Sequence, residues 1–158
     1  MKFLSVTIAF SFAMLNLSPR LLAQNAPAIP SFNQVEKIMI FSHGGWMLNI
    51  NQDGSGSLVY GSSGGDLARI PEKTFSFQEV YNLLVPHLIG SSTDEKSIAV
   101  ALFVKGLAPG TATHAHYLDD TKIVRQIMAE ARAKSVPLNP TSFKELLLKY
   151  PPEWDDTK

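Results

Sequence analysis

Residues 46–61, WMLNINQDGSGSLVYG, decide how the first part of this chain folds. Two apolar runs flank a polar segment that contains Asp53-Gly54-Ser55-Gly56. Glycine accepts the positive φ angles that tight hairpin turns require, and Asp and Ser are common in such turns. The β-branched and aromatic residues on both sides favour strands. The stretch therefore predicts a β-hairpin.

The neighbouring segments extend this hairpin into a sheet followed by a helix. Residues 35–41, VEKIMIF, have the composition of a strand, and residues 67–70, LARI, predict a short edge strand. From Ser76 the apolar residues recur every three and four positions, which is the spacing of one helix face. Ser76 and Glu79 match a capping box, and Pro86 ends or kinks the helix because it has no amide proton.

The same order of elements follows once more. Residues 97–106, SIAVALFVKG, predict a central strand, and residues 111–118, TATHAHYL, predict a strand that runs back. Asp119 or Asp120 can cap a helix with an apolar stripe, and a last helix begins at Asn139 or Ser142. The predicted stripes are Ile123, Val124, Ile127, Met128 and Ala131 in the first of these helices, and Phe143, Leu146, Leu147 and Tyr150 in the second.

Two strand-turn-strand-helix units predict an α+β domain over residues 35–158. We expect one antiparallel sheet of four to five strands, with two to three helices packed on one of its faces.

The N-terminus predicts export. Lys2 precedes an apolar run over residues 3–17, and the segment that follows suits signal-peptide cleavage after Ala23. The run is shorter than the roughly 20 residues of a spanning helix, although an N-terminal membrane anchor is the alternative. Residues 1–23 are thus predicted to be a signal peptide and residues 24–34 a linker, and we expect the mature protein to be periplasmic or secreted.

Composition restricts the partners. The chain has no cysteine, so the core must hold the domain together without disulfides. It has 14 basic and 14 acidic residues, and removal of the leader with Lys2 and Arg20 leaves a net charge of −2. No basic run or basic face indicates a nucleic-acid partner. No second apolar stretch is long enough to span a membrane, so no membrane contact is expected of the mature form.

Residues 49–66 also allow three functional interpretations. Asn51, Asp53, Ser55 and Gly56 occupy positions one, three, five and six of an EF-hand-like calcium loop, but Ser62 replaces the acid at position twelve. Residues 61–65, GSSGG, match G-x-S-x-G around Ser63, but no helix is expected directly after them. A phosphate-binding loop would also open a helix. The structural turn is the interpretation that these residues favour.

His114 and His116 are candidate zinc ligands. Alternate residues of a strand face the same way, so the two imidazoles could share an ion, with His43 or Asp119 as a third ligand. The alternative is a solvated strand face. Trp46 belongs either to the core or to a binding surface, with the core favoured, and Trp154 either folds back onto the domain or meets a partner.

No coherent catalytic set emerges from the sequence. We therefore expect a non-enzymatic secreted or periplasmic binding protein without a cofactor, such as an inhibitor or immunity-type protein, with another protein as its partner. The alternative hypothesis is a small metal-dependent hydrolase that uses the histidine pair to bind zinc.

Overall fold

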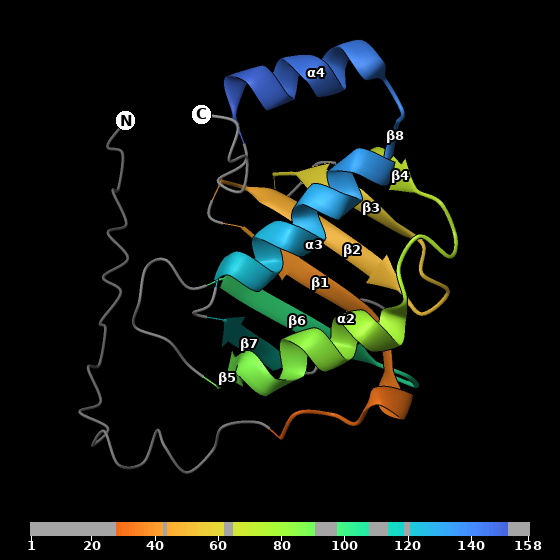
Figure 1. The fold of residues 1–158 in the computed structure, drawn as a ribbon, viewed down its shortest axis with the longest axis vertical. Coiled ribbons are helices and arrows are strands. Elements are labelled where there is room, and N and C mark those ends of the chain that lie inside the picture. The colour runs from red at the N-terminus through yellow and green to blue at the C-terminus, as the bar shows by residue number, and fades with distance from the viewer. Residues whose placement is uncertain are drawn as a thin grey trace, which may run out of the picture.

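The computed structural model describes residues 28–42, 44–61, 65–90, 98–107, 114–118 and 121–151. They form one antiparallel sheet of eight strands with three α-helices (Figure 1). The strands are β1 (Val35–Phe41), β2 (Trp46–Asn51), β3 (Gly56–Tyr60), β4 (Asp66–Ile70), β5 (Leu88–Ile89), β6 (Ile98–Val104), β7 (His114–Leu118) and β8 (Val136–Pro137). The helices are α2 (Phe77–Leu84), α3 (Thr121–Lys134) and α4 (Pro140–Lys149), and the 3-10 turns are η1 (Phe32–Gln34) and η2 (Val85–His87).

The strand order is β5-β7-β6-β1-β2-β3-β4-β8. Strands β1 to β4 form a meander, and the chain then crosses the sheet as α2. β6 adds to the free side of β1, and β7 pairs with β6. α3 crosses back and leads to β8, which pairs with β4. The first long strand therefore lies in the middle of the sheet, with later segments on both sides.

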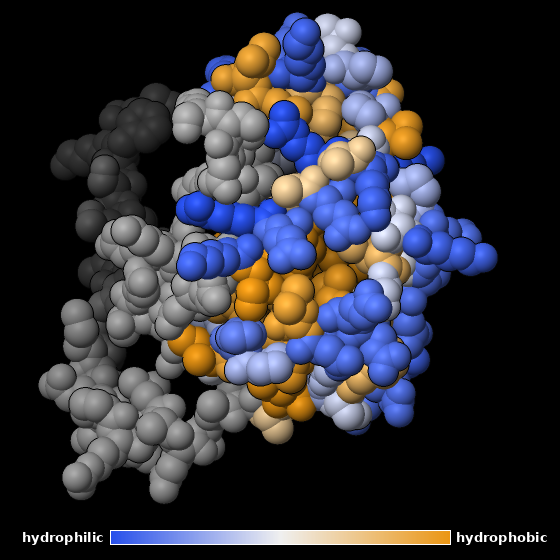
Figure 2. All heavy atoms as spheres, in the orientation of Figure 1, coloured by the Kyte–Doolittle hydropathy of each residue, from blue (hydrophilic) through white to orange (hydrophobic). Residues whose placement is uncertain are grey.

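The core lies between the helices and one face of this sheet. Strand residues alternate between faces, so Ile38, Ile40 and Leu48 point to the helices while their neighbours point away. The core cluster combines these residues with the helix stripes. Val124, Met128 and Ala131 of α3 are completely buried in it, as the sequence spacing predicts. Figure 2 shows hydrophilic residues over much of this side of the molecule, with an apolar band between α2 and α3.

Side-chain caps fix where the helices begin. The Ser76 hydroxyl accepts a hydrogen bond from the Glu79 amide at the start of α2, and Pro86 lies in the 3-10 turn η2 that follows the helix. Asn139 rather than Ser142 caps α4, since its Oδ1 accepts from the Ser142 amide at 3.1 Å. These bonds satisfy amides that the first helical turn leaves without partners. Asp119 and Asp120 lie outside the described residues.

Part of the segment predicted as a linker packs on the domain. The Tyr81 hydroxyl donates to the Pro30 carbonyl at 2.5 Å, and the Phe32 ring lies 6.0 Å from Phe77. Burial raises the pKa of Tyr81, because it disfavours the charged phenolate. Residues 30–34 thus belong structurally to the domain, while the predicted signal peptide lies outside the described residues.

The α+β class and the antiparallel sheet are confirmed, but four to five strands was an undercount. Two of the eight, β5 and β8, have only two residues each, too short for any periodicity to mark them. Residues 67–70, predicted as an edge strand, form most of β4 and are flanked by β3 and β8. The first unit accordingly has four strands before its helix. In the described part of the chain, no helix is long and apolar enough to cross a membrane.

Candidate functional site

The face of the sheet that points away from the helices carries the candidate site. We call this surface the second face. The register places on it Lys37, Met39 and Phe41 of β1, Met47, Asn49 and Asn51 of β2, Ser57 and Val59 of β3, Asp66 and Arg69 of β4, Ala99, Ala101 and Phe103 of β6, and Tyr117 of β7. Val59, Ala101 and Phe103 are buried but do not belong to the core cluster, as expected for side chains on the opposite side.

The second face is divided by composition. One row across neighbouring strands contains Tyr117, Ala99, Phe41, Met47 and Val59, which are apolar apart from the Tyr117 hydroxyl, and it ends at Asp66 of β4. The next row begins as Ala101 and Met39 and continues as Asn49, Ser57 and Arg69. Polar residues therefore gather at one corner, over β2 to β4.

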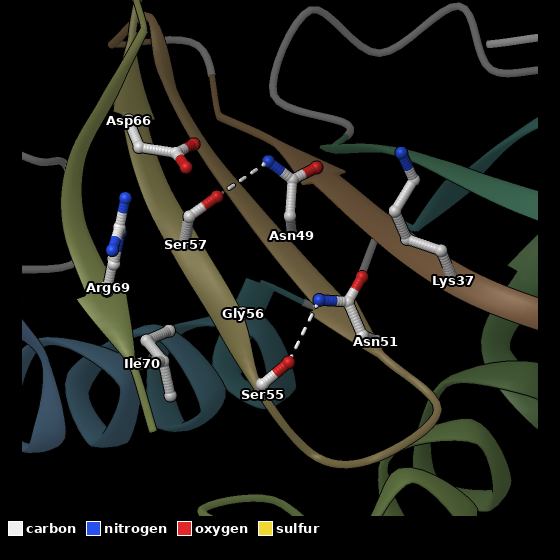
Figure 3. Close-up of a pocket in the computed structure, with 9 residues that line it drawn as sticks. All are labelled: Lys37, Asn49, Asn51, Ser55, Gly56, Ser57, Asp66, Arg69 and Ile70. Atoms are coloured by element: carbon white, nitrogen blue, oxygen red, sulfur yellow. Dashed lines mark hydrogen bonds between the residues drawn. The ribbon is translucent and has the colours of Figure 1, made fainter. Parts of the chain in front are cut away.

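An open recess of about 400 Å³ lies at this polar corner (Figure 3). We call it the polar recess. β1 contributes Lys37 to its lining, β2 Asn49 and Asn51, the β2–β3 turn Ser55, β3 Gly56 and Ser57, and β4 Asp66, Arg69 and Ile70. Figure 3 shows the Lys37 ammonium on one side of the Asn49–Ser57 pair and the Arg69 guanidinium on the other.

A β-bulge brings both charged residues of β4 to the recess. Asp66 and Arg69 are three positions apart, and in a regular strand they would point to opposite faces. Val59 pairs with Asp66 whereas Leu58 pairs with Ala68, so Leu67 is an extra residue in β4. This insertion turns Asp66 onto the same face as Arg69.

The two cations of the recess form no ion pair with any described residue. The Lys37 Nζ lies 4.1 Å from the centre of the Phe103 ring, a cation–π contact that orients the ammonium without using its N–H donors. Arg69 and Asp66 line the same recess without forming a salt bridge to each other. The recess therefore holds two positive charges and one negative charge.

Between the cations lies a partly satisfied amide. Asn49 Nδ2 donates to the Ser57 hydroxyl at 3.1 Å, and Ser57 is only 7% exposed. The Asn49 Oδ1 is buried and accepts no hydrogen bond from the described residues. Such a group costs about 1–3 kcal/mol, so fold stability alone does not explain an asparagine here.

The loop after Asn51 confirms the structural turn. The Gly54 amide donates to the Asn51 carbonyl at 2.9 Å, and the Asn51 amide donates to the Ser55 carbonyl at 2.8 Å. Gly54 has φ +77°, so the turn is a three-residue hairpin loop with a glycine in the left-handed region. The Asp53 Oδ1 accepts from the Ser55 amide at 2.9 Å, and hydrogen bonds from the Ser55 side chain and amide lower the pKa of Asp53. The calcium-loop side chains thus bond to one another within the turn.

The proposed nucleophile Ser63 lies outside the described residues, as does Ser62. The chain continues from Gly65 into β4 rather than into a helix, so the helix that a nucleophile elbow requires does not follow.

The structure locates only part of the predicted zinc set. His116 is 1% exposed, and it lies on the helix-covered face opposite Val100. His114 lies on β7 opposite Leu102, the side chain of His114 is not described, and His43 and Asp119 lie outside the described residues. Within residues 28–151, excluding the undescribed gaps, no group of three or more His, Asp or Glu side chains could hold a metal ion.

Trp46 belongs to the core. It is 1% exposed, and its Nε1 donates to the Tyr150 carbonyl at 2.9 Å, which ties the end of α4 to the sheet. Its ring lies 5.2 Å from Tyr60 and 6.0 Å from Phe143. Trp46 thus has a structural position, while Trp154 lies outside the described residues.

Sequence reasoning missed the polar recess, although a pattern was present. Asn49 and Asn51 alternate with apolar residues in β2, and Lys37 does so in β1, which places polar groups on one face of each strand. These residues lie near Arg69 only because of the strand order and the bulge in β4. No local sequence pattern indicates either feature.

Comparisons with protein-family models, with curated proteins and with solved structures give no match to this chain.

Proposed function

We propose that this chain is an exported, non-enzymatic binding protein that holds another protein against the second face of its sheet. The observation that carries the proposal is the polar recess, in which two cations form no ion pair with a described residue and outnumber the one acid, beside an apolar surface on the same face. The serine hydroxyls of the recess accept hydrogen bonds from the amides of Asn49 and Asn51, and no described group of three His, Asp or Glu side chains could hold a metal ion, which supports recognition rather than catalysis.

The apolar part of the second face supports a macromolecular partner. An antiparallel sheet covered on one face normally presents polar residues to water on the other. Here Met39, Phe41 and Met47 occupy central positions of that face and remain partly accessible. Protein interfaces are enriched in aromatic residues and methionine, and methionine adapts its shape to the surface it meets. Apolar contact area beside fixed charges is the combination that a protein partner uses.

Among the described residues, no observation favours the alternative of a metal-dependent hydrolase. A catalytic zinc needs an accessible open coordination position. His116 is 1% exposed on the face that the helices cover, so its side chain is not at a surface that a substrate reaches.

The test compares how well two variants capture the partner protein, one substituted on the second face and the other on a helix. Purified protein is used as bait for the exported proteins of its own source, and a photoreactive residue at Met39 identifies what touches the second face. Met47→Glu places a charge on the second face, and Leu148→Glu places the same charge on α4, where Leu148 is 75% exposed. We expect Met47→Glu to abolish capture and Leu148→Glu to retain it. Equal capture by both variants, with both folded, would overturn the proposal.

A further inference from the structure

We propose that the polar recess binds a carboxylate, presented as an Asp or Glu side chain of the partner protein. This inference rests on the proposed function, and it assigns the group that anchors the partner. It is argued from the charges, the hydrogen-bond donors and the acceptors that line the recess.

Charge gives the first step. Lys37 on β1 and Arg69 on β4 stand on either side of β2 and β3, about 14 Å apart at the backbone for three strand spacings. Figure 3 shows their charged ends on opposite sides of the Asn49–Ser57 pair, and the Lys37 ammonium rests on Phe103 of β6, so Arg69 is the cation that a bound group contacts directly. With Asp66 as the one acid in the lining, the recess carries a net charge of one positive unit. A group with one negative charge balances it.

Available donors give the second step. The Lys37 ammonium has three N–H donors and rests on the Phe103 ring, and Arg69 has five donors in a planar fork. Neither side chain donates a hydrogen bond to a described residue. A guanidinium matches the two oxygens of a carboxylate, and such charge-assisted bonds are the stronger kind.

The remaining groups disfavour a phosphate. One common kind of phosphate site uses the free backbone amides of a glycine-rich loop. In the turn beside this recess those amides are occupied, because Gly54 N bonds to Asn51 and Ser55 N bonds to Asp53. Asp66 would also repel a doubly charged phosphate more strongly than a singly charged carboxylate.

A sugar ligand is disfavoured because the aromatic side chain beside the recess cannot stack on a sugar ring. Phe103 is 7% exposed and its ring face is covered by Lys37, so it offers no platform on which a sugar ring could stack. A planar, singly charged carboxylate is the ligand class that fits the charges and the donors together.

The experiment uses small probes and the isotope-labelled protein. N-acetyl-glutamate methylamide is titrated while backbone amide shifts are recorded, and N-acetyl-glutamine methylamide is the neutral probe of the same shape. We expect saturable shifts in β2, β3 and β4 with the glutamate probe, with a dissociation constant on the order of 10 mM, and none with the glutamine probe. Methyl phosphate is the third probe and should bind at least tenfold more weakly.

Variants assign the binding to the two cations. Arg69→Gln should weaken the glutamate probe about tenfold, as for the loss of a charge-assisted bond. Lys37→Gln should weaken it less, because the Lys37 ammonium rests on Phe103 of β6 and acts on the carboxylate by its charge alone. Lys149→Gln is the control, because Lys149 also lies over an aromatic ring, 5.2 Å from the centre of Tyr150, but on α4 away from the recess. It should leave binding unchanged.

Three results would overturn the inference. They are equal shifts with the glutamine probe, unchanged binding in the Lys37→Gln/Arg69→Gln double variant, or tighter binding of methyl phosphate. Loss of partner capture in Met47→Glu together with any of these results would leave the proposed function standing and refute the carboxylate anchor alone. The two failures are therefore distinguishable.

Discussion

Replacing Gly54 by alanine tests the conformation of the turn that closes the β2–β3 hairpin. Gly54 has φ +77°, and a Cβ built on it would lie 2.2 Å from the Phe75 carbonyl oxygen and 3.2 Å from Lys73 Cα. Those neighbours are backbone atoms, held by hydrogen bonds from the Phe75 amide to Gly54 and from the Lys73 amide to Asp53. They cannot move aside as a flexible side chain would. The methyl group must therefore displace one loop from the other.

Gly61 supplies the matched control. Its φ is +78°, yet nothing lies within 4 Å of the corresponding Cβ position. Alanine at either position pays about 1–2 kcal/mol for the left-handed conformation, offset by about 0.4–1 kcal/mol from the less flexible unfolded chain. Gly61→Ala should therefore destabilise by roughly 1 kcal/mol. Gly54→Ala adds about 1–3 kcal/mol for forcing packed groups apart, so roughly 2–4 kcal/mol is expected in total.

Urea denaturation and thermal melts measure the difference. For a domain of this size, 1 kcal/mol moves Tm by about 3–5 °C, so an extra loss of about 1–3 kcal/mol should lower the Tm of Gly54→Ala by roughly 3–15 °C more than that of Gly61→Ala. The decisive result is which variant loses more stability, because both positions have nearly the same φ and differ only in the atoms around the added Cβ. Equal losses, or a smaller loss for Gly54→Ala, would refute the close approach between the two loops.

Three further predictions concern the recess, the core and the turn. Replacing Asn49 by leucine and Ser57 by alanine together removes a hydrogen-bonded pair and an unsatisfied oxygen. The free energy of unfolding measured in urea should therefore fall by less than about 1 kcal/mol, or increase. A larger fall would mean that the pair stabilises the fold. Trp46→Phe should cost about 1–3 kcal/mol and speed amide exchange in α4, because it removes the bond to the Tyr150 carbonyl and leaves space in the core; unchanged exchange would contradict that anchoring. Hydrogen bonds from Ser55 lower the pKa of Asp53 in the folded protein below its ordinary value of 3.8. The ionised side chain therefore stabilises the fold above pH 3.8, and this stabilisation is lost as the pH falls through the pKa of the folded state. The stability gap between wild type and Asp53→Asn should then narrow in acid, and added calcium should raise the melting temperature of neither protein.

Local features of the chain could be read from the sequence because local physics controls them. The turn around Gly54 follows from the φ that only glycine adopts easily, and the start of α2 follows from a serine oxygen within reach of a free amide. The apolar spacing in α3 identifies its buried stripe because helix geometry repeats every 3.6 residues. Each of these depends on residues only a few positions apart.

The strand count and the strand order depended on contacts between distant segments. β5 and β8 are strands because they find partners in β7 and β4, and two residues have no period of their own. β6 pairs with β1 although it begins 57 positions after β1 ends (98 − 41), and α3 then returns over the sheet to place β8 at the far edge. Sequence pattern gives the faces of single strands, but it does not give their neighbours.

The candidate site also depends on contacts between distant segments. By itself the sequence determined that the chain has no cysteine, that residues 46–61 turn back on themselves, and that polar residues alternate with apolar ones in two strands. Only the tertiary structure decided that Lys37 and Arg69 flank one recess. Four strands had to assemble in one order, and a bulge at Leu67 had to turn Asp66 onto the shared face. Alternation fixes direction within a strand, whereas proximity between strands arises only when the whole sheet closes over its core.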